Sequence, residues 1–280
     1  MTNVLCIGGS TLNRDCQPGI IEDLKMSGIF KNNWAVIIAI HKYLLMYDQL
    51  SLCNKTVFRE KRRTDLCEAF AGLNFVLLEA SGEYTVKPGD IYILPDSLYY
   101  KKNPDDDNLI YLKIQIFMKK DNLVINVSEV VRKMINSNSH FSEESVIREE
   151  ESAGESVSNS CAEDQSIPDL EDLPHIDDVM TQIAHNNREQ TAGLLLAGMG
   201  DDGAEGMLII HQQGGVTAVQ APDNCIRPPE YPDRDNGEMP RKAIDLANQT
   251  GFSHDIICLQ EQGQESCLRQ WLTTLHDKNR

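Results

Sequence analysis

A glycine-rich loop near residue 200 is the first segment of this sequence whose residue types and spacing could support chemistry. Residues 194–207 read LLLAGMGDDGAEGM, so that an apolar run leads into Gly198, Gly200 and Gly203 and a helix-like segment follows. Glycines at this spacing between a strand and a helix can cradle the pyrophosphate of a dinucleotide. The same tight turn can instead present a carboxylate to a neighbouring side chain, so the motif alone leaves two kinds of site open.

The two aspartates inside the loop argue against phosphate binding. Asp201 and Asp202 would stand where phosphate oxygens need to lie, and two like charges about 4 Å apart repel by roughly 4 kcal/mol at an effective dielectric constant of about 20. The attraction of a helix N-terminus for an anion is only about 1 kcal/mol. A dinucleotide site also needs an acid at the end of the next strand, where this sequence has Gln220. A structural use of the loop, with an aspartate capping the following helix, stays open.

Two further candidate residues follow predicted strands elsewhere in the chain. Ser10 follows the short apolar run that begins the sequence, and His41 follows the apolar run 35–40 directly. The nucleophile-elbow motif G-x-S-x-G requires a glycine two residues after the serine, where this sequence has Leu12. A serine in a turn and a histidine at a strand end also have structural uses, so neither residue identifies a site by itself.

The elements predicted around these residues are strands that alternate with helices. Strands are expected at 4–7, 35–40, 75–78, 90–94, 109–117, 192–197, 215–220 and 255–259, and helices at 20–30, 59–72, 175–186, 202–213, 239–249 and up to about 276. This alternation predicts an α/β fold, a doubly wound, mostly parallel sheet with helices on both faces. Such sheets bind ligands outside the carboxyl ends of their strands, where the serine, the histidine and the aspartate loop all belong.

The composition is that of an ordinary globular protein. The chain has 280 residues, 41% apolar and 25% charged, and is long enough to bury a sizeable core. Its formal net charge of −17 argues against nucleic acid or an anionic membrane surface as a partner. The apolar runs are far shorter than the roughly 20 residues of a membrane span, and no basic leader is evident. The eight cysteines lack paired or metal-finger spacing, so we expect reduced thiols and a cytoplasmic protein.

An acidic segment interrupts the pattern of strands and helices. Residues 136–172 contain eleven Asp and Glu residues against Arg148 alone, with many Ser and Asn and few large apolar residues. Such a composition cannot bury enough surface to offset its ordering entropy. We therefore predict that 136–172 is a disordered linker or insertion, and that residues 1–135 and 173–280 form a single α/β domain.

A serine, a histidine and an aspartate at three strand ends of one sheet are the components of an acyl-transfer triad. In the segments that carry them, the sequence resembles the CheB-type chemotaxis methylesterases. The family's I-G-x-S-T-G-G, Q-H and L-T-G-M-G-x-D-G-A-x-G-M motifs correspond to residues 7–11, 40–41 and 196–207. Shorter matches lie at 86–95, 176–180, 214–220 and 239–244. The resemblance covers most of the chain outside the acidic segment.

The resemblance implies a site and a reaction. Ser10 would be the nucleophile, His41 its general base and Asp202 the carboxylate that orients the histidine, while Thr11 and Met199 would line the oxyanion and substrate region. The family hydrolyses glutamyl methyl esters on the cytoplasmic domains of methyl-accepting chemoreceptors, and some members also deamidate glutamines there. This reaction needs no metal and no organic cofactor.

The sequence also departs from the family pattern. Leu12 and Asn13 stand where the family has two glycines after Ser-Thr, Ile40 replaces the glutamine before the histidine, and Glu238 replaces the glycine before Met239. Loss of one oxyanion donor slows such an enzyme by about 10²–10³. The alternatives to an active esterase are therefore a catalytically impaired relative that binds receptors or signalling partners, and a nucleotide-dependent oxidoreductase. Because the sequence begins on its first predicted strand, we expect no receiver domain ahead of the catalytic domain.

Overall fold

The computed structural model describes residues 1–9, 17–40, 68, 70–78, 81–94, 101–102, 108–133, 175–225, 235–259 and 266–277. Its strands are β1 (Asn3–Gly9), β2 (Trp34–Ile40), β3 (Asn74–Leu77), β4 (Gly82–Thr85), β5 (Asp90–Ile93), β6 (Lys101–Lys102), β7 (Asn108–Lys119), β8 (Asn122–Lys133), β9 (Thr191–Leu195), β10 (Val216–Gln220) and β11 (Asp255–Ile257). Its helices are α1 (Gln17–Met26), α3 (Ile176–Asn187), α4 (Ala204–Gln212), α5 (Glu238–Thr250) and α6 (Cys267–Asp277), with 3-10 turns η1 (Ile29–Lys31), η4 (Arg188–Gln190) and η5 (Pro222–Asn224). None of the helices in these ranges is both long and apolar enough to cross a membrane.

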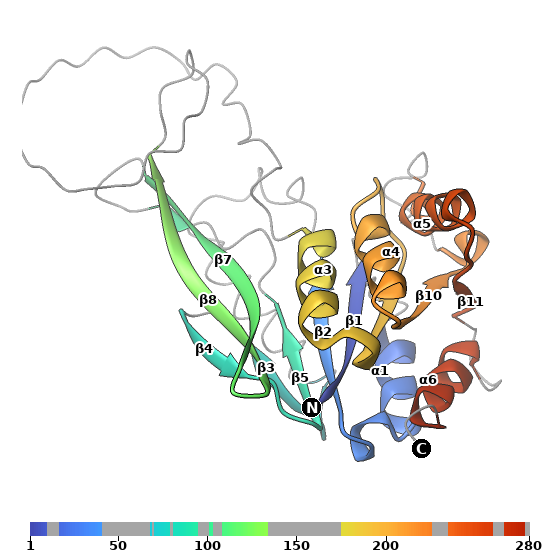
Figure 1. The fold of residues 1–280 in the computed structure, drawn as a ribbon, viewed down its shortest axis with the longest axis horizontal. Coiled ribbons are helices and arrows are strands. Elements are labelled where there is room, and N and C mark those ends of the chain that lie inside the picture. Colours follow the sequence, from blue (N-terminus) through green and yellow to red (C-terminus); the bar gives the residue numbers. More distant parts are fainter. Residues whose placement is uncertain are drawn as a thin grey trace, which may run out of the picture.

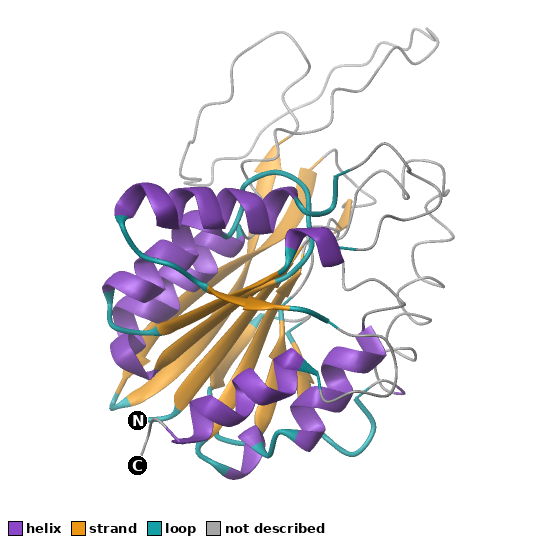
Figure 2. Cartoon of the chain, turned by 90° about the vertical axis from the view of Figure 1, so that its right-hand side faces the viewer, coloured by secondary structure: helices purple, strands orange, loops and turns teal. Residues whose placement is uncertain are grey.

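A parallel sheet forms the centre of the molecule. Its strand order is β11-β10-β9-β1-β2-β5-β3, so that β1 lies in the middle between β9 and β2 (Figure 1). Each neighbouring pair runs parallel. Helices α3, α4 and α5 pack on one face of the sheet, and α1 and α6 pack on the other (Figure 2). The predicted doubly wound, mostly parallel α/β fold is confirmed.

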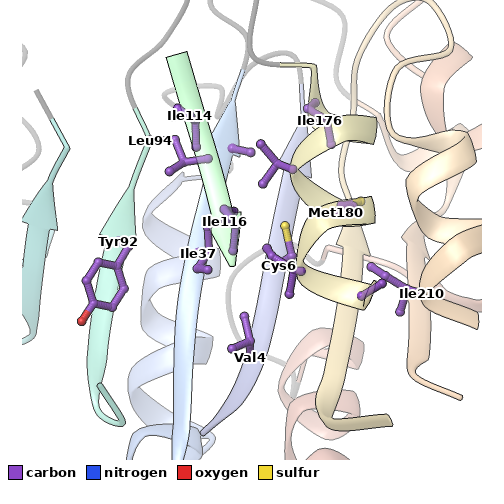
Figure 3. Close-up of a cluster of buried hydrophobic side chains, with 14 of the residues drawn as sticks. Val4, Cys6, Ile37, Tyr92, Leu94, Ile114, Ile116, Ile176, Met180 and Ile210 are labelled. Carbon is purple, nitrogen blue, oxygen red and sulfur yellow. The ribbon is translucent and has the colours of Figure 1, made fainter. Parts of the chain in front are cut away.

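Both faces of the central strands are buried, which explains why their sequences are predominantly apolar. In β1, Val4 and Cys6 belong to the core on the α3 side, and the residues that alternate with them, Leu5 and Ile7, belong to the core on the α1 side. Figure 3 shows the first of these cores. Burial raises the pKa of the Cys6 thiol to about 12, so this cysteine is an unreactive packing residue.

A second, antiparallel sheet in the order β4-β8-β7-β6 stands beside the first (Figure 1). The sequence predicted the strand at β7 and missed β4, β6 and β8. Two side-chain amides of α3 pair with β7. Gln182 Oε1 accepts the N–H of Ile116 at 2.7 Å, while Asn186 accepts the N–H of Met118 at 3.2 Å and donates to the carbonyl of Ile116 at 3.1 Å. Helix α3 therefore joins the antiparallel sheet to the parallel one.

Helix α1 begins and ends earlier than the helix predicted at 20–30. It ends at Met26, because Gly28 takes a left-handed φ of 72° and the chain continues as η1 rather than as an α-helix. Two other predictions fall wholly or mostly on residues outside the described ranges: the acidic segment 136–172, and the helix expected at 59–72, of which residues 70–72 form a turn. The division into one domain and a linker stays a prediction.

Candidate active site

The predicted site lies at the carboxyl ends of three adjacent strands. β1 pairs with β2 so that Gly9 is opposite Ile40, and it pairs with β9 so that Gly8 is opposite Leu195. The three strands therefore end at nearly the same level of the sheet. The chain leaves them at one edge, the edge where a doubly wound fold places its ligands.

The predicted site residues fall into two groups. Ser10, Thr11 and His41 lie outside the described residues, although the strand residues that directly precede Ser10 and His41 are the register partners at the ends of β1 and β2. Met199 and Asp202 belong to the described loop between β9 and α4. Met199 is half-buried, and the side chain of Asp202 is 17% exposed. Assembly of the three triad side chains stays a prediction.

Asp202 binds the N-terminus of helix α3 with both carboxylate oxygens. The N–H of Ile176 donates to Oδ2 at 2.9 Å, and the N–H of Asp177 donates to Oδ1 at 2.9 Å. These N–H groups have no acceptor within their own helix, and the helix dipole favours a negative charge at this end. A loop aspartate does cap a helix, but the helix is α3, which precedes the loop, and not α4, which follows it. A carboxylate has about four acceptor sites, so capping α3 does not exhaust those that an imidazole N–H would use.

A second histidine lies close to Asp202. His175 precedes α3 as its N-cap residue, and its Nδ1 is 4.0 Å from Asp202 Oδ2, with a side chain that is 37% exposed. No sequence pattern singles out His175, because the contact arises only where the start of α3 meets the loop after β9. Any test of the predicted general base must therefore include this imidazole.

Asp177, in the first turn of α3, binds the first turn of α4 with its carboxylate. Its Oδ1 accepts the N–H of Gly206, in the first turn of α4, at 2.6 Å. Burial raises the pKa of Asp177 to about 6, against the opposing effect of the Gly206 N–H, and the negative charge of Asp202 raises this pKa further. Each of the two helices thus receives a carboxylate from the N-terminal region of the other. Asp177 is part of the short match at 176–180, but its spacing in the sequence did not reveal this role.

Two glycines permit the close approach of α3 and α4. Gly203 has a φ of +98°, and a Cβ placed on it would lie 3.1 Å from Ile176 Cγ2 in α3 and 2.5 Å from Leu195 Cδ1 in β9. A Cβ on Gly206 would lie 2.6 Å from the Cβ of Met180 and 3.1 Å from the Cα of Asp177. The carboxylate exchange therefore depends on glycine at both positions.

The backbone of the glycine-rich loop is held by acceptors of this protein. Three of its N–H groups donate as follows: Ala197 to Gln220 Oε1 at 2.9 Å, Gly198 to the carbonyl of Asn236 at 2.7 Å, and Gly200 to Glu238 Oε2 at 2.9 Å. A phosphate cradle requires such donors to point at the ligand. The occupied donors and the acidic side chains together disfavour a nucleotide at this loop.

Comparison with known proteins identifies a family. A family model described as CheB methylesterase matches residues 71–255, a range that includes Asp202 and begins after Ser10 and His41. The fold is similar to the crystal structure of the Thermotoga maritima CheB methylesterase catalytic domain, with a TM-score of 0.54 and 14% identity over 99% of each chain. At that identity the structural similarity concerns the fold alone.

Similarity to curated relatives extends over shorter segments. The protein-glutamate methylesterase/protein-glutamine glutaminase of Pectobacterium atrosepticum is 38% identical over 91 residues, which are 32% of this chain and 22% of that protein. The protein of the same name from Salmonella typhimurium is 29% identical over 92 residues, 33% of this chain and 23% of that protein. The matched segments therefore span less than a quarter of either relative.

Proposed function

This chain belongs to the CheB methylesterase family, and on that basis we propose that it is a serine hydrolase of glutamyl methyl esters on the cytoplasmic domains of methyl-accepting chemoreceptors. Glutamine deamidation on the same receptors is the related activity, and the site of action would be the cytoplasm. The observation that carries the proposal is the adjacency of β9, β1 and β2, whose ends lead into the Asp202 loop, Ser10 and His41. The names of the relatives support the same reaction class.

The first half of the proposed reaction transfers the receptor glutamyl group to the enzyme. The Ser10 hydroxyl attacks the ester carbonyl carbon while His41 accepts the hydroxyl proton, and the carbonyl oxygen takes the negative charge of the tetrahedral intermediate. When the intermediate collapses, His41 returns the proton to the leaving methoxy oxygen. Methanol departs, and the glutamyl group remains on Ser10 as an ester.

The second half releases the receptor by the same groups. His41 removes a proton from water, the resulting hydroxide attacks the glutamyl-serine ester, and the proton returns to the Ser10 oxygen. The products are the receptor glutamate carboxylate and free enzyme. With a glutamine substrate the first leaving group is ammonia, and the acyl-enzyme and its hydrolysis are unchanged.

In this mechanism Asp202 orients His41 and stabilises its protonated form. The hydrogen bonds from the N-terminus of α3 fix both oxygens of this carboxylate before substrate binds. Such preorganisation lowers the reorganisation required during the reaction. Anchoring of the loop through Gln220 and Glu238 serves the same end.

Methanol release from a methylated receptor cytoplasmic fragment tests the proposal. We expect Ser10→Ala and His41→Gln each to reduce the rate by at least about 10³, because members of a triad act as a unit. His175→Gln is the matched control for the histidine and is expected to stay within about threefold of the wild type. Asp202→Asn and Asp201→Asn form a second matched pair, in which only the first should lose activity. A wild-type rate of methanol release equal to that of Ser10→Ala would overturn the proposed esterase function.

The departures at Leu12 and Asn13 keep the impaired, receptor-binding relative as the second candidate. Capping of α3 by Asp202 is compatible with a catalytically impaired relative, because that contact stabilises the fold whether or not a triad forms. Receptor binding by a chain whose methanol release equals that of Ser10→Ala is the outcome that would favour this candidate.

A further inference from the structure

Helices α3 and α4 run side by side, and their N-termini lie at the same end of the pair as the carboxyl edge of the sheet (Figure 1). Asp202, two residues before α4, caps α3, and Asp177, in the first turn of α3, caps α4. Asp177 takes part in both halves of this exchange. Its own N–H donates to Asp202 Oδ1, and its carboxylate accepts the N–H of Gly206.

The Asp177 carboxylate also acts on the peptide that directly follows Asp202. The N–H groups of Gly206 and Gly203 both favour its ionised form, since each lowers the pKa of Asp177. Asp202 is therefore bound by the N-terminus of α3, and Asp177, the second residue of that helix, also binds the first turn of α4. A displacement of Asp177 would shift both constraints at once.

We propose that Asp177 is a positioning residue for Asp202, acting through its own backbone N–H and through the first turn of α4 to fix the carboxylate that orients the catalytic histidine. This inference rests on the triad proposed above. Asp177 itself does not touch the reacting atoms in this scheme, and its effect on catalysis passes through Asp202.

The electrostatic setting distinguishes this role from simple capping. Asp177 faces two other acids, Asp202 and Glu205, and both raise its pKa in addition to the effect of burial. An uncharged acceptor could cap α4 without that repulsion. The charge is unfavourable for the fold here, but it gives a stronger hydrogen bond to Gly206 than a neutral acceptor would. Protonation of Asp177 as the pH falls below about 6 weakens that bond, so the positioning should weaken with it.

The test compares Asp177→Ala, Asp177→Asn and the matched control Asp178→Asn, which changes an exposed acid in the same helical turn. The assay is methanol release from the methylated receptor fragment, with kcat and KM measured between pH 5 and 8. At pH 7.5 we expect Asp177→Ala to lower kcat by about 10- to 100-fold with KM within about threefold, because a misplaced catalytic group costs rate rather than affinity. Asp177→Asn retains an acceptor oxygen but loses the charge, so it should lower kcat about 3- to 10-fold at pH 7.5. The ratio of wild-type kcat to Asp177→Asn kcat should fall toward one below about pH 6, where Asp177 is itself protonated. Asp178→Asn should match the wild type throughout.

A second readout does not depend on activity. Hydrogen exchange of the Ile176 and Asp177 amides reports the hydrogen bonds to Asp202, and we expect Asp177→Ala to raise both exchange rates at least about tenfold. If wild type and Ser10→Ala release methanol equally, the proposed esterase function is refuted. The exchange rates then still decide whether Asp177 positions Asp202. A folded Asp177→Ala with wild-type exchange and kcat would overturn the inference. If that variant does not fold, a ratio of wild-type kcat to Asp177→Asn kcat that stays constant between pH 5 and 8 would overturn it.

Discussion

The contact between α3 and α4 makes the substitution Gly206→Ala a sharp test of the site's architecture. Alanine is favoured over glycine in a helix by about 1 kcal/mol. The added Cβ would, however, lie 2.6 Å from the Cβ of Met180 and 3.1 Å from both the Cα and the carbonyl oxygen of Asp177. None of these atoms can move by a side-chain rotation, so the helices must separate, and overpacking of this kind costs about 1–3 kcal/mol. We expect a net loss of up to about 2 kcal/mol in the free energy of unfolding, measured by urea denaturation.

Gly19→Ala is the matched control. Gly19 is the third residue of α1, as Gly206 is of α4, and nothing lies within 4 Å of a Cβ placed on Gly19. The same propensity gain without a clash should stabilise the protein by about 0.5–1 kcal/mol. The two substitutions are therefore expected to have opposite signs. Equal stabilisation by both would refute the inference that α3 and α4 are in contact through Gly206.

Three other predictions concern stability. The pKa of Asp177 is raised to about 6 in the folded state, so the folded state binds more protons than the unfolded state between about pH 4 and 6, and stability falls as the pH rises through this window. After solvent screening this loss is worth about 1–2 kcal/mol. Asp177→Asn should remove the loss, measured by urea denaturation at pH 4.5 and 7.5. His254 behaves oppositely: burial lowers its pKa to about 4, so stability is lost as pH falls from about 6.5 to 4, and His254→Asn should flatten that loss in the same measurement. Arg269→Ala leaves the buried Asp23 carboxylate without its 3.0 Å partner and should cost about 2–4 kcal/mol, seen as a lower thermal unfolding midpoint.

Controls for these predictions come from exposed residues of the same helices. Asp178→Asn should leave the pH profile unchanged, and Glu22→Gln in α1 should leave the unfolding midpoint within about 1–2 °C of the wild type. A pH profile of Asp177→Asn that parallels the wild type would contradict the raised pKa. A neutral Arg269→Ala would show that Asp23 is stabilised without the guanidinium.

Sequence patterns are most informative where the physics is local. Strand β2 is apolar at every position and β1 is apolar from Val4 to Ile7, because both faces are covered. The apolar residues of α3, α4 and α5 recur at the spacing of amphipathic helices. Strand β8 was missed although its apolar and polar residues alternate from Ile125 to Ser128, because its partner is an antiparallel neighbour outside the βα pattern.

The site was predictable only in its parts. The loop motif pointed to Asp202, but no local pattern indicates that its carboxylate binds Ile176 and Asp177, whose amides lie 26 and 25 residues away in the chain. The approach of His175 and the return contact from Asp177 to Gly206 are likewise tertiary. Such contacts follow from how two helices pack, and a single sequence carries no periodic signal for them.

The amides of Gln182 and Asn186 have a consequence for association between molecules. A β-strand whose outward N–H and C=O groups are unpaired can recruit a strand from another molecule, and such recruitment is a common route to aggregation. In β7 the outward groups of Ile116 and the N–H of Met118 are already bonded to α3. A foreign strand could add along that stretch only by displacing a helix that is also anchored to Asp202 at its other end. The same helix thus protects the hairpin from templated self-association.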